Sequence, residues 1–177
     1  AYENAAAFRG DPTRIAVCGD SAGGGLAALV CHAAYDEGGP AIAHQSLLYP
    51  STDATQSFPS AAEHGGAPVL SAEKIRVFTD HYLGDSVDPA DPGVSAYWRK
   101  DLHGMPPALI QTADLDTLTA ALSDQPRIPT FTKRANVARD RLAVDKVSDH
   151  PALLPQTSCA VRPWRHACRC PVIYLTC

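Results

Sequence analysis

The sequence predicts an α/β protein in which a parallel sheet is connected by crossover helices. A short apolar run, Ile15–Val17, leads into a Gly-x-Ser-x-Gly motif at residues 19–23. An Ala/Leu-rich stretch follows, so the local order is strand, sharp turn, helix. His44–Tyr49 and Pro106–Thr112 are two further strand candidates. Strands that alternate with helices indicate a parallel sheet.

The first half of the chain gives a clear order of elements. Residues 1–8 are Ala-rich and predict a helix, which ends at the loop 9–12. The second predicted helix covers 22–35, and its small first residues favour close packing on the sheet. Residues 36–40 hold two glycines and a proline, which end that helix.

The segment between the second and third strands predicts one further helix. Residues 51–66 are polar and turn-rich, and we expect them to form a cap over the site or a connection. Ser71 is the expected N-cap of a helix that runs to Leu83, with Ile75, Phe78 and Tyr82 on one face. Residues 85–101 predict a loop.

Ser21 is the candidate nucleophile. The Gly-x-Ser-x-Gly pattern forces the serine into a strained backbone conformation, and glycines at both flanks remove Cβ atoms that would collide there. The following helix directs its unpaired N–H groups toward the site. The N–H of Ala22 is therefore a candidate donor to a developing oxyanion.

Composition excludes several classes of function. The chain has 177 residues, 45% hydrophobic content and a net charge of −4, and these values are typical of a globular protein. Its charge does not favour nucleic acid as a partner. The apolar run 26–35 is too short to span a bilayer, and no secretory signal opens the sequence. We expect a cytoplasmic protein whose N-terminus is incomplete.

Several further segments carry a resemblance to a known family. Residues 1 to about 118 resemble the hormone-sensitive-lipase-like branch of the α/β-hydrolase esterases. The segments that match are Phe8-Arg9-Gly10-Asp11-Pro12-Thr13-Arg14-Ile15-Ala16-Val17, Gly19-Asp20-Ser21-Ala22-Gly23-Gly24, Leu48-Tyr49-Pro50, His81-Tyr82-Leu83-Gly84 and Leu102-His103-Gly104-Met105-Pro106-Pro107-Ala108-Leu109-Ile110.

The resemblance implies a partial α/β-hydrolase fold and a carboxylic ester hydrolase that acts on small-molecule esters without metal or organic cofactor. By the same resemblance, Ser21 is the nucleophile and Asp116 is the acid of the catalytic triad. Asp116 lies in the segment Asp114-Leu115-Asp116-Thr117-Leu118, just past a predicted strand. The order of serine before aspartate agrees with the family.

Two motifs of the family are missing from this sequence. The His-Gly-Gly-Gly oxyanion motif belongs upstream of Ser21, and His64-Gly65-Gly66 lies downstream in another connection. No Gly-x-x-His-Gly-Phe-like turn follows Asp116. His150 follows it by 34 positions, without a nearby glycine, and is the nearest candidate for the triad histidine. We therefore expect esterase ancestry with impaired activity in this chain.

The composition changes after Leu118. Residues 119–177 contain no glycine and no glutamate, but they hold nine Lys or Arg against four Asp, a net charge of +5. We divide the chain into a partial hydrolase domain, 1–118, and an atypical tail, 119–177, without a regular period outside Val137–Val147. One interpretation of the tail is a reading-frame shift near Leu118, and a frame-shifted tail is expected to be disordered. A divergent C-terminal extension is the other.

The cysteines and histidines of the tail predict no metal site. The segment 166–170 reads His-Ala-Cys-Arg-Cys, but only Cys159 and Cys177 stand nearby, and zinc sites need paired ligands at proper spacing. Cys18 and Cys31 lie in predicted core elements, where a cysteine behaves as a small apolar residue.

Two other functions stay open beside the ester hydrolase. One is a catalytically silent hydrolase fold that binds a small ligand. The other is a defective, truncated product that forms no stable fold, because early strands of the sheet are missing.

Overall fold

The computed structural model describes residues 2–67, 70–113, 116–118, 130–135 and 172–175. Its elements in chain order are η1 (Ala5–Phe8), β1 (Ile15–Asp20), α1 (Ala22–Asp36), β2 (Ile42–Leu48), α2 (Pro59–Glu63), α3 (Ala72–Leu83), η2 (Ala96–Trp98), β3 (Ala108–Ala113), β4 (Thr130–Ala135) and β5 (Val172–Leu175). The first three predicted strands and the two longer helices are therefore confirmed. The helix predicted over residues 1–8 is wrong in extent, because only the 3₁₀ turn η1 forms there.

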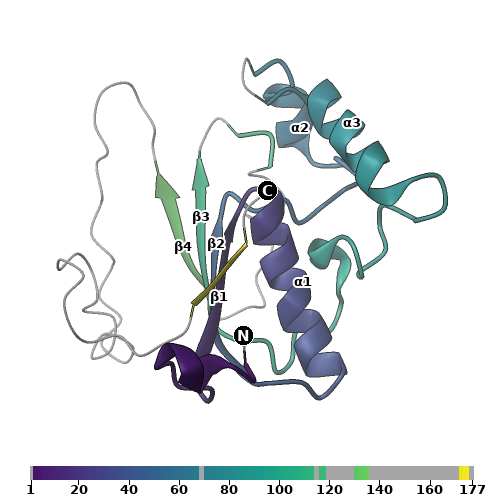
Figure 1. Ribbon diagram of the computed structural model, residues 1–177. Coiled ribbons are helices and arrows are strands. Elements are labelled where there is room, and N and C mark those ends of the chain that lie inside the picture. Colours follow the sequence, from purple (N-terminus) through teal and green to yellow (C-terminus); the bar gives the residue numbers. More distant parts are fainter. Residues whose placement is uncertain (1, 68–69, 114–115, 119–129, 136–171, 176–177) are drawn as a thin grey trace.

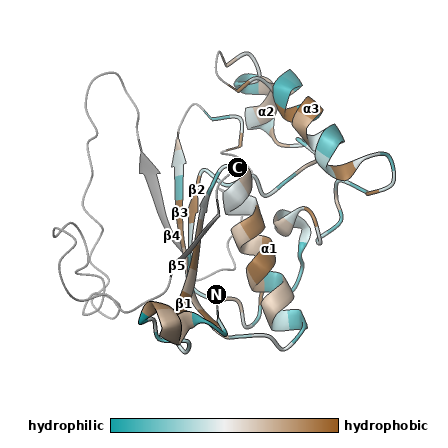
Figure 2. Ribbon diagram, in the orientation of Figure 1, coloured by the Kyte–Doolittle hydropathy of each residue, from teal (hydrophilic) through white to brown (hydrophobic). Residues whose placement is uncertain are grey.

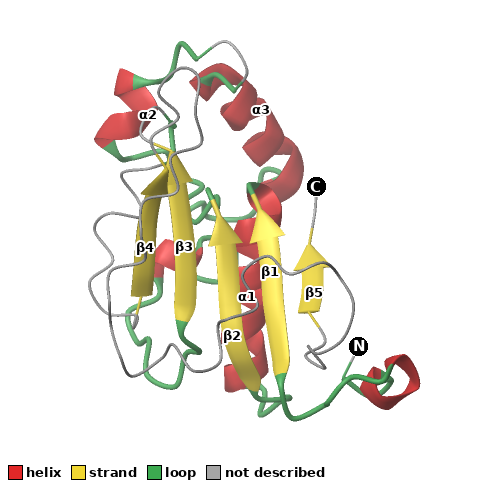
Figure 3. Cartoon of the chain, turned by 90° about the vertical axis from the view of Figure 1, so that its left-hand side faces the viewer, coloured by secondary structure: helices red, strands yellow, loops and turns green. Residues whose placement is uncertain are grey.

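The strands form one sheet (Figure 1), in the order β4-β3-β2-β1-β5, and each pair of neighbouring strands is parallel. Asp20 of β1 pairs with Leu48 of β2, and Leu48 in turn pairs with Gln111 of β3. The carboxyl ends of β1, β2 and β3 therefore lie together at one edge of the sheet. Figure 3 shows this edge with α2 and α3 beyond it.

The core lies between the sheet and α1. Side chains alternate in burial along β1 and β3, so every second residue faces the core. Helix α1 contacts β1, β2 and β5. Figure 2 shows hydrophobic residues on α1 and on the strands beside it. The buried cluster consists of Val17, Ala27, Ala28, Cys31, Leu47, Ala96, Met105, Ala108 and Ile110. Small residues on α1 allow the close packing that the sequence predicts.

Two prolines just before β3, Pro106 and Pro107, accept hydrogen bonds from Gln45 of β2. The buried Gln45 donates from Nε2 to the carbonyl of Pro106 at 3.0 Å and from its backbone N–H to the carbonyl of Pro107 at 3.0 Å. Proline has no N–H to donate, but its carbonyl still accepts, and both carbonyls here accept from the neighbouring strand. This contact fixes the register of β3 on β2.

Helix α3 differs from the expected amphipathic helix. Ser71 caps it as predicted, accepting a hydrogen bond from the N–H of Lys74 at 3.3 Å. However, Phe78 and Tyr82 are 63% and 60% exposed, and Leu83 is the buried residue of this helix. The face that spacing alone assigns to the core is therefore largely open.

Residues 119–177 supply two strands to the sheet. β4 pairs with β3, and β5 pairs with β1, although the sequence indicates no regular period at either segment. Expected features at Val137–Val147, His150, His166 and the four tail cysteines lie outside the described residues. The division at Leu118 stays a prediction.

Candidate active site

Ser21 lies at the sharp turn between β1 and α1. Its backbone has φ 53° and ψ −125°, a region that L-residues rarely adopt. A Cβ on Gly19 would collide with the backbone of Gly23 and would lie 2.8 Å from the nitrogen of Gly24. The first glycine of the motif is thus required by the return of the chain over the end of β1.

The backbone of Ser21 is held by hydrogen bonds on both sides. Its N–H donates to the carbonyl of Leu48 at 2.9 Å. Its carbonyl accepts from the N–H groups of Gly24 at 3.1 Å, Gly25 at 3.2 Å and Ser51 at 2.9 Å. The glycine-rich start of α1 and the turn after β2 together keep the serine in its rare conformation.

Ala22 is the first residue of α1, where backbone N–H groups have no acceptor one turn earlier. The positive end of the helix dipole adds to the attraction for negative charge at this position. These properties suit the N–H of Ala22 to an oxyanion formed beside Ser21.

Asp116 follows β3 at the same edge of the sheet. Its N–H donates to the carbonyl of Ala113 at 3.3 Å, and its Oδ1 accepts from the N–H of Leu118 at 3.2 Å. Because β2 lies between β1 and β3, the strands that carry Ser21 and Asp116 are about 10 Å apart. The structure brings both residues to one edge, and it describes no hydrogen bond between them.

The loop after β3 is tied to α2. Ser60 donates from Oγ to the carbonyl of Thr117 at 2.7 Å, and both residues are buried. A cavity of about 10 Å³ lies beside this contact, lined by Thr52, Asp53, Gln56, Phe58, Ala61, Ile75, Thr117 and Leu118. Residues 51–66 thus support the Asp116 loop from the side.

No histidine in the described part of the chain forms a hydrogen bond with Ser21 or Asp116. His32 is buried in α1, His81 contacts the carbonyl of Val77 at 2.6 Å, and His103 lies 3.4 Å from the hydroxyl of Tyr35. His64 follows α2, as expected for a loop residue. His150, the nearest candidate from the sequence, falls outside the description.

The described residues hold no group of three His, Cys, Asp or Glu side chains that suits a metal ion. Cys18 and Cys31 are free thiols, and burial raises the pKa of Cys31 to about 12. Such a thiol stays protonated and packs as an apolar group. No helix described in this structure is both long and apolar enough to cross a membrane.

Sequence reasoning missed the turn after β2, residues 49–51. Tyr49 has a positive φ of 35°, which is unusual for a bulky residue. A signal was present, because Gly24 and Gly25 continue the glycine run beyond the motif. Their missing Cβ atoms make room for Pro50 and Ser51.

Comparisons with known proteins agree with this geometry. The alpha/beta hydrolase fold family matches residues 1–124. Carboxylesterase NlhH of Mycobacterium tuberculosis is 45% identical over 120 residues, covering 66% of this chain and 37% of NlhH. Carboxylic ester hydrolase LipN of the same species is 46% identical over 124 residues, covering 67% of this chain and 33% of LipN. The chain therefore spans about a third of the length of these relatives.

Two solved structures show the same arrangement of elements. A thermostable esterase from Pseudomonas putida ECU1011 superposes with a TM-score of 0.67 at 30% identity, covering 76% of this chain and 45% of that one. A hyperthermophilic esterase from Pyrobaculum calidifontis gives a TM-score of 0.63 at 34% identity, covering 70% and 43%.

Proposed function

Because the chain belongs to the alpha/beta hydrolase fold family, we propose that it derives from a carboxylic ester hydrolase and that Ser21 is its nucleophile. The observation that carries this proposal is the backbone of Ser21, at φ 53° and ψ −125° between β1 and α1. Backbone strain of this kind persists only where the surrounding structure enforces it. The sharp turn that carries the strain presents the serine hydroxyl at the end of a strand.

In the proposed reaction, Ser21 Oγ attacks the carbonyl carbon of a small-molecule ester. A base accepts the hydroxyl proton while the new C–O bond forms, and the N–H of Ala22 donates to the resulting oxyanion. Collapse of the tetrahedral intermediate expels the alcohol, which takes up that proton. Water then attacks the acyl carbon and gives a proton to the base, the bond to Ser21 Oγ breaks as Oγ takes up that proton, and the carboxylic acid is released.

Asp116 is the proposed acid of the triad. Its support is its position after β3, at the sheet edge that also carries Ser21, and its fixed turn with Leu118. In this role the carboxylate orients a histidine and stabilises its charged form. The role of Asp116 depends on a histidine partner, because the members of a triad act as a unit.

We further propose that ester hydrolysis by this chain is impaired. The sequence after Asp116 has no Gly-x-x-His-Gly-Phe-like turn, which favours the alternative of a hydrolase fold that binds a small ligand without turnover. Loss of the histidine alone removes most of the rate of a serine hydrolase. The need for neither metal nor cofactor, the absence of a nucleic-acid partner and a cytoplasmic location stay predictions from the sequence.

Hydrolysis of p-nitrophenyl acetate by the purified chain and by Ser21→Ala tests the proposal. We expect slow hydrolysis that Ser21→Ala abolishes and Asp116→Asn lowers, with Ser86→Ala as the control at an exposed serine. Rapid hydrolysis that depends on Ser21 would contradict the impairment. Hydrolysis that Ser21→Ala leaves unchanged would contradict the assigned nucleophile, and saturable ligand binding without turnover would favour the alternative.

A further inference from the structure

We propose that the turn formed by residues 49–51, after β2, is the positioning device of the nucleophile, and that it acts through the backbone of Ser51. The inference rests on the proposed role of Ser21. It concerns residues that do not touch the reacting atoms.

The first argument is the pattern of hydrogen bonds. The N–H of Ser21 donates to the carbonyl of Leu48, just before the turn, and the N–H of Ser51, the last residue of the turn, donates to the carbonyl of Ser21, each at 2.9 Å. The two peptide planes that flank the Ser21 Cα are therefore both anchored to one short segment. Rotation of Ser21 out of its rare φ and ψ would break one of these bonds.

The second argument is the close approach of the turn to α1. A Cβ on Gly24 would lie 2.7 Å from Cβ and 2.9 Å from Cα of Pro50. A Cβ on Gly25 would overlap the carbonyl oxygen of Ser51. The first turn of α1 thus lacks side chains where the turn packs, and Ser51 reaches the carbonyl of Ser21 only because of that space.

The third argument is the link to the other half of the site. The N–H of Tyr49 donates to the carbonyl of Gln111 at 2.6 Å, which extends the contact to β3, the strand before Asp116. Tyr49 itself is held at φ 35°. A bulky residue keeps such a conformation only when its neighbours fix it. The turn therefore contacts both the loop that carries the proposed nucleophile and the strand that precedes the proposed acid.

A matched pair of substitutions at Ser51 isolates the backbone bond. Ser51→Pro removes the N–H that donates to Ser21, whereas Ser51→Ala keeps the N–H and removes only the hydroxyl. Two readouts follow: the rate at which a fluorophosphonate labels Ser21, measured by mass spectrometry as kinact and KI, and the amide exchange of Ser21 measured by NMR. Relative to Ser51→Ala, we expect Ser51→Pro to lower kinact by at least about 10-fold, to change KI little, and to speed the exchange of the Ser21 N–H by a similar factor.

A second variant keeps the test decisive if Ser51→Pro does not fold. Gly25→Ala should displace the carbonyl of Ser51 and slow labelling by at least about 10-fold, although alanine favours the helix over glycine. Gly66→Ala is the control, because no atom lies within 4 Å of its added Cβ. A role limited to helix stability predicts the opposite sign for Gly25→Ala.

Failure of this inference is distinct from failure of the proposed function. If the unmodified chain is not labelled at Ser21, the proposed nucleophile is wrong, and the exchange of the Ser21 amide still decides whether the turn holds it. If Ser51→Pro and Ser51→Ala match in labelling and in exchange, or if Gly25→Ala labels like Gly66→Ala, the positioning role is overturned.

Discussion

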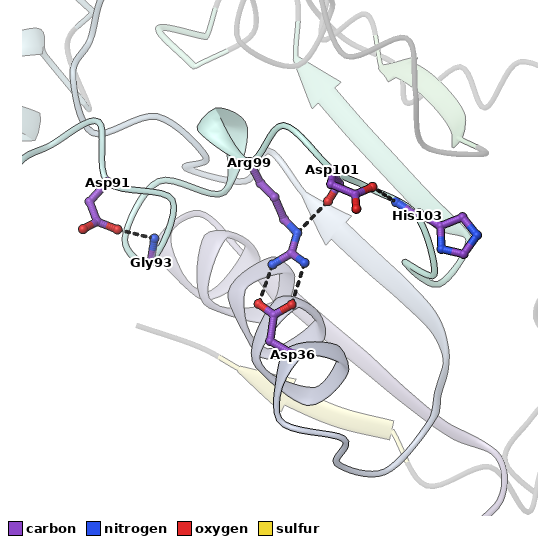
Figure 4. Close-up of polar contacts among 6 residues, drawn as sticks. All are labelled: Asp36, Asp91, Gly93, Arg99, Asp101 and His103. Atoms are coloured by element: carbon purple, nitrogen blue, oxygen red, sulfur yellow. Dashed lines mark hydrogen bonds and ion pairs between the residues drawn. The ribbon is translucent and has the colours of Figure 1, made fainter.

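The guanidinium of Arg99 binds the carboxylate of Asp36 through two hydrogen bonds of 2.6 Å, Nη1 to Oδ2 and Nη2 to Oδ1. Its Nε donates to the carbonyl of Asp101 at 2.7 Å, and Asp101 in turn accepts from the N–H of His103 (Figure 4). Asp36 is the last residue of α1, so this pair fastens the loop after η2 to the helix whose other end follows Ser21.

The Asp36–Arg99 pair predicts a loss of stability in acid. The hydrogen bonds from Arg99 lower the pKa of Asp36 below its usual 3.8. The contribution of the pair is thus present above that value and is lost as the pH falls through the lowered pKa of the folded chain. We expect Asp36→Asn to lower the Tm at neutral pH, and the difference from the unmodified chain to vanish in strong acid.

Asp80→Asn is the matched control for this prediction. Asp80 pairs with Arg76 one turn away on α3, with both side chains more than half exposed. A single exposed pair of this kind contributes little. Thermal unfolding followed by circular dichroism at several pH values should separate the two variants, and equal shifts in Tm would contradict the prediction.

His32 predicts a second pH dependence at higher pH. The pKa of this histidine is lowered to about 4, chiefly by burial and also by the charge of Arg99, while Asp36 opposes the shift. The unfolded chain therefore takes up a proton near pH 6.5 that the folded chain refuses until about pH 4, so stability falls as the pH drops across this window. One such proton gives a slope of at most about 1.4 kcal/mol per pH unit.

His32→Leu should flatten that slope. The variant also removes Nδ1, which is buried and has no hydrogen-bond partner in the described structure. At pH 5 its free energy of unfolding should therefore be no lower than that of the unmodified chain. His81→Leu, at an exposed position on α3, is the control and should keep the slope. Urea unfolding at a series of pH values measures the slope of both variants. An unchanged slope in His32→Leu would contradict the assignment of this pH dependence to His32.

Ser60→Ala tests the support of the Asp116 loop. The substitution leaves the buried carbonyl of Thr117 without the 2.7 Å hydrogen bond from Ser60 Oγ. Loss of one partner from a buried pair costs about 1–3 kcal/mol of unfolding free energy. Urea unfolding should show this loss, while Ser86→Ala, at an exposed serine, should change stability by less than about 0.5 kcal/mol. Equal effects would show that the contact adds nothing.

The sequence predicts the part of the fold in which local pattern and tertiary contacts agree. β1, the Ser21 turn and α1 follow from an apolar run, a glycine-flanked serine and a helix former in succession. The exposure of Phe78 and Tyr82 did not follow, because periodicity shows that a helix has an apolar face without showing what that face packs against.

Contacts between distant segments explain the rest of what sequence reasoning missed. Tyr49 lies at a sheet edge where its N–H meets Gln111, and no local pattern near Tyr49 indicates a positive φ. The strands β4 and β5 lack a clear apolar alternation, and their pairing with β3 and β1 is a property of the sheet. Such pairing depends on neighbouring edges that a sequence window does not contain.

The strained backbone of Ser21 gives the last prediction, which separates backbone strain from side-chain chemistry. Serine and alanine both carry a Cβ, so Ser21→Ala should keep the strain that φ 53° and ψ −125° impose. Ser21→Gly relieves it, and the gain exceeds the added freedom of glycine in the unfolded chain. We therefore expect the free energy of unfolding of Ser21→Gly to exceed that of Ser21→Ala by about 1 kcal/mol.

The same pair of substitutions at Ser86 provides the reference for this comparison, because Ser86 is exposed and has no positive φ. We expect Ser86→Gly to be no more stable than Ser86→Ala, since glycine gives the unfolded chain more conformational freedom and relieves no strain in the folded chain. Urea unfolding of all four variants measures both differences. If Ser21→Gly is no more stable than Ser21→Ala, the serine is not strained, and its hydrogen bonds with Leu48 and Ser51 then hold a conformation that the chain adopts without cost.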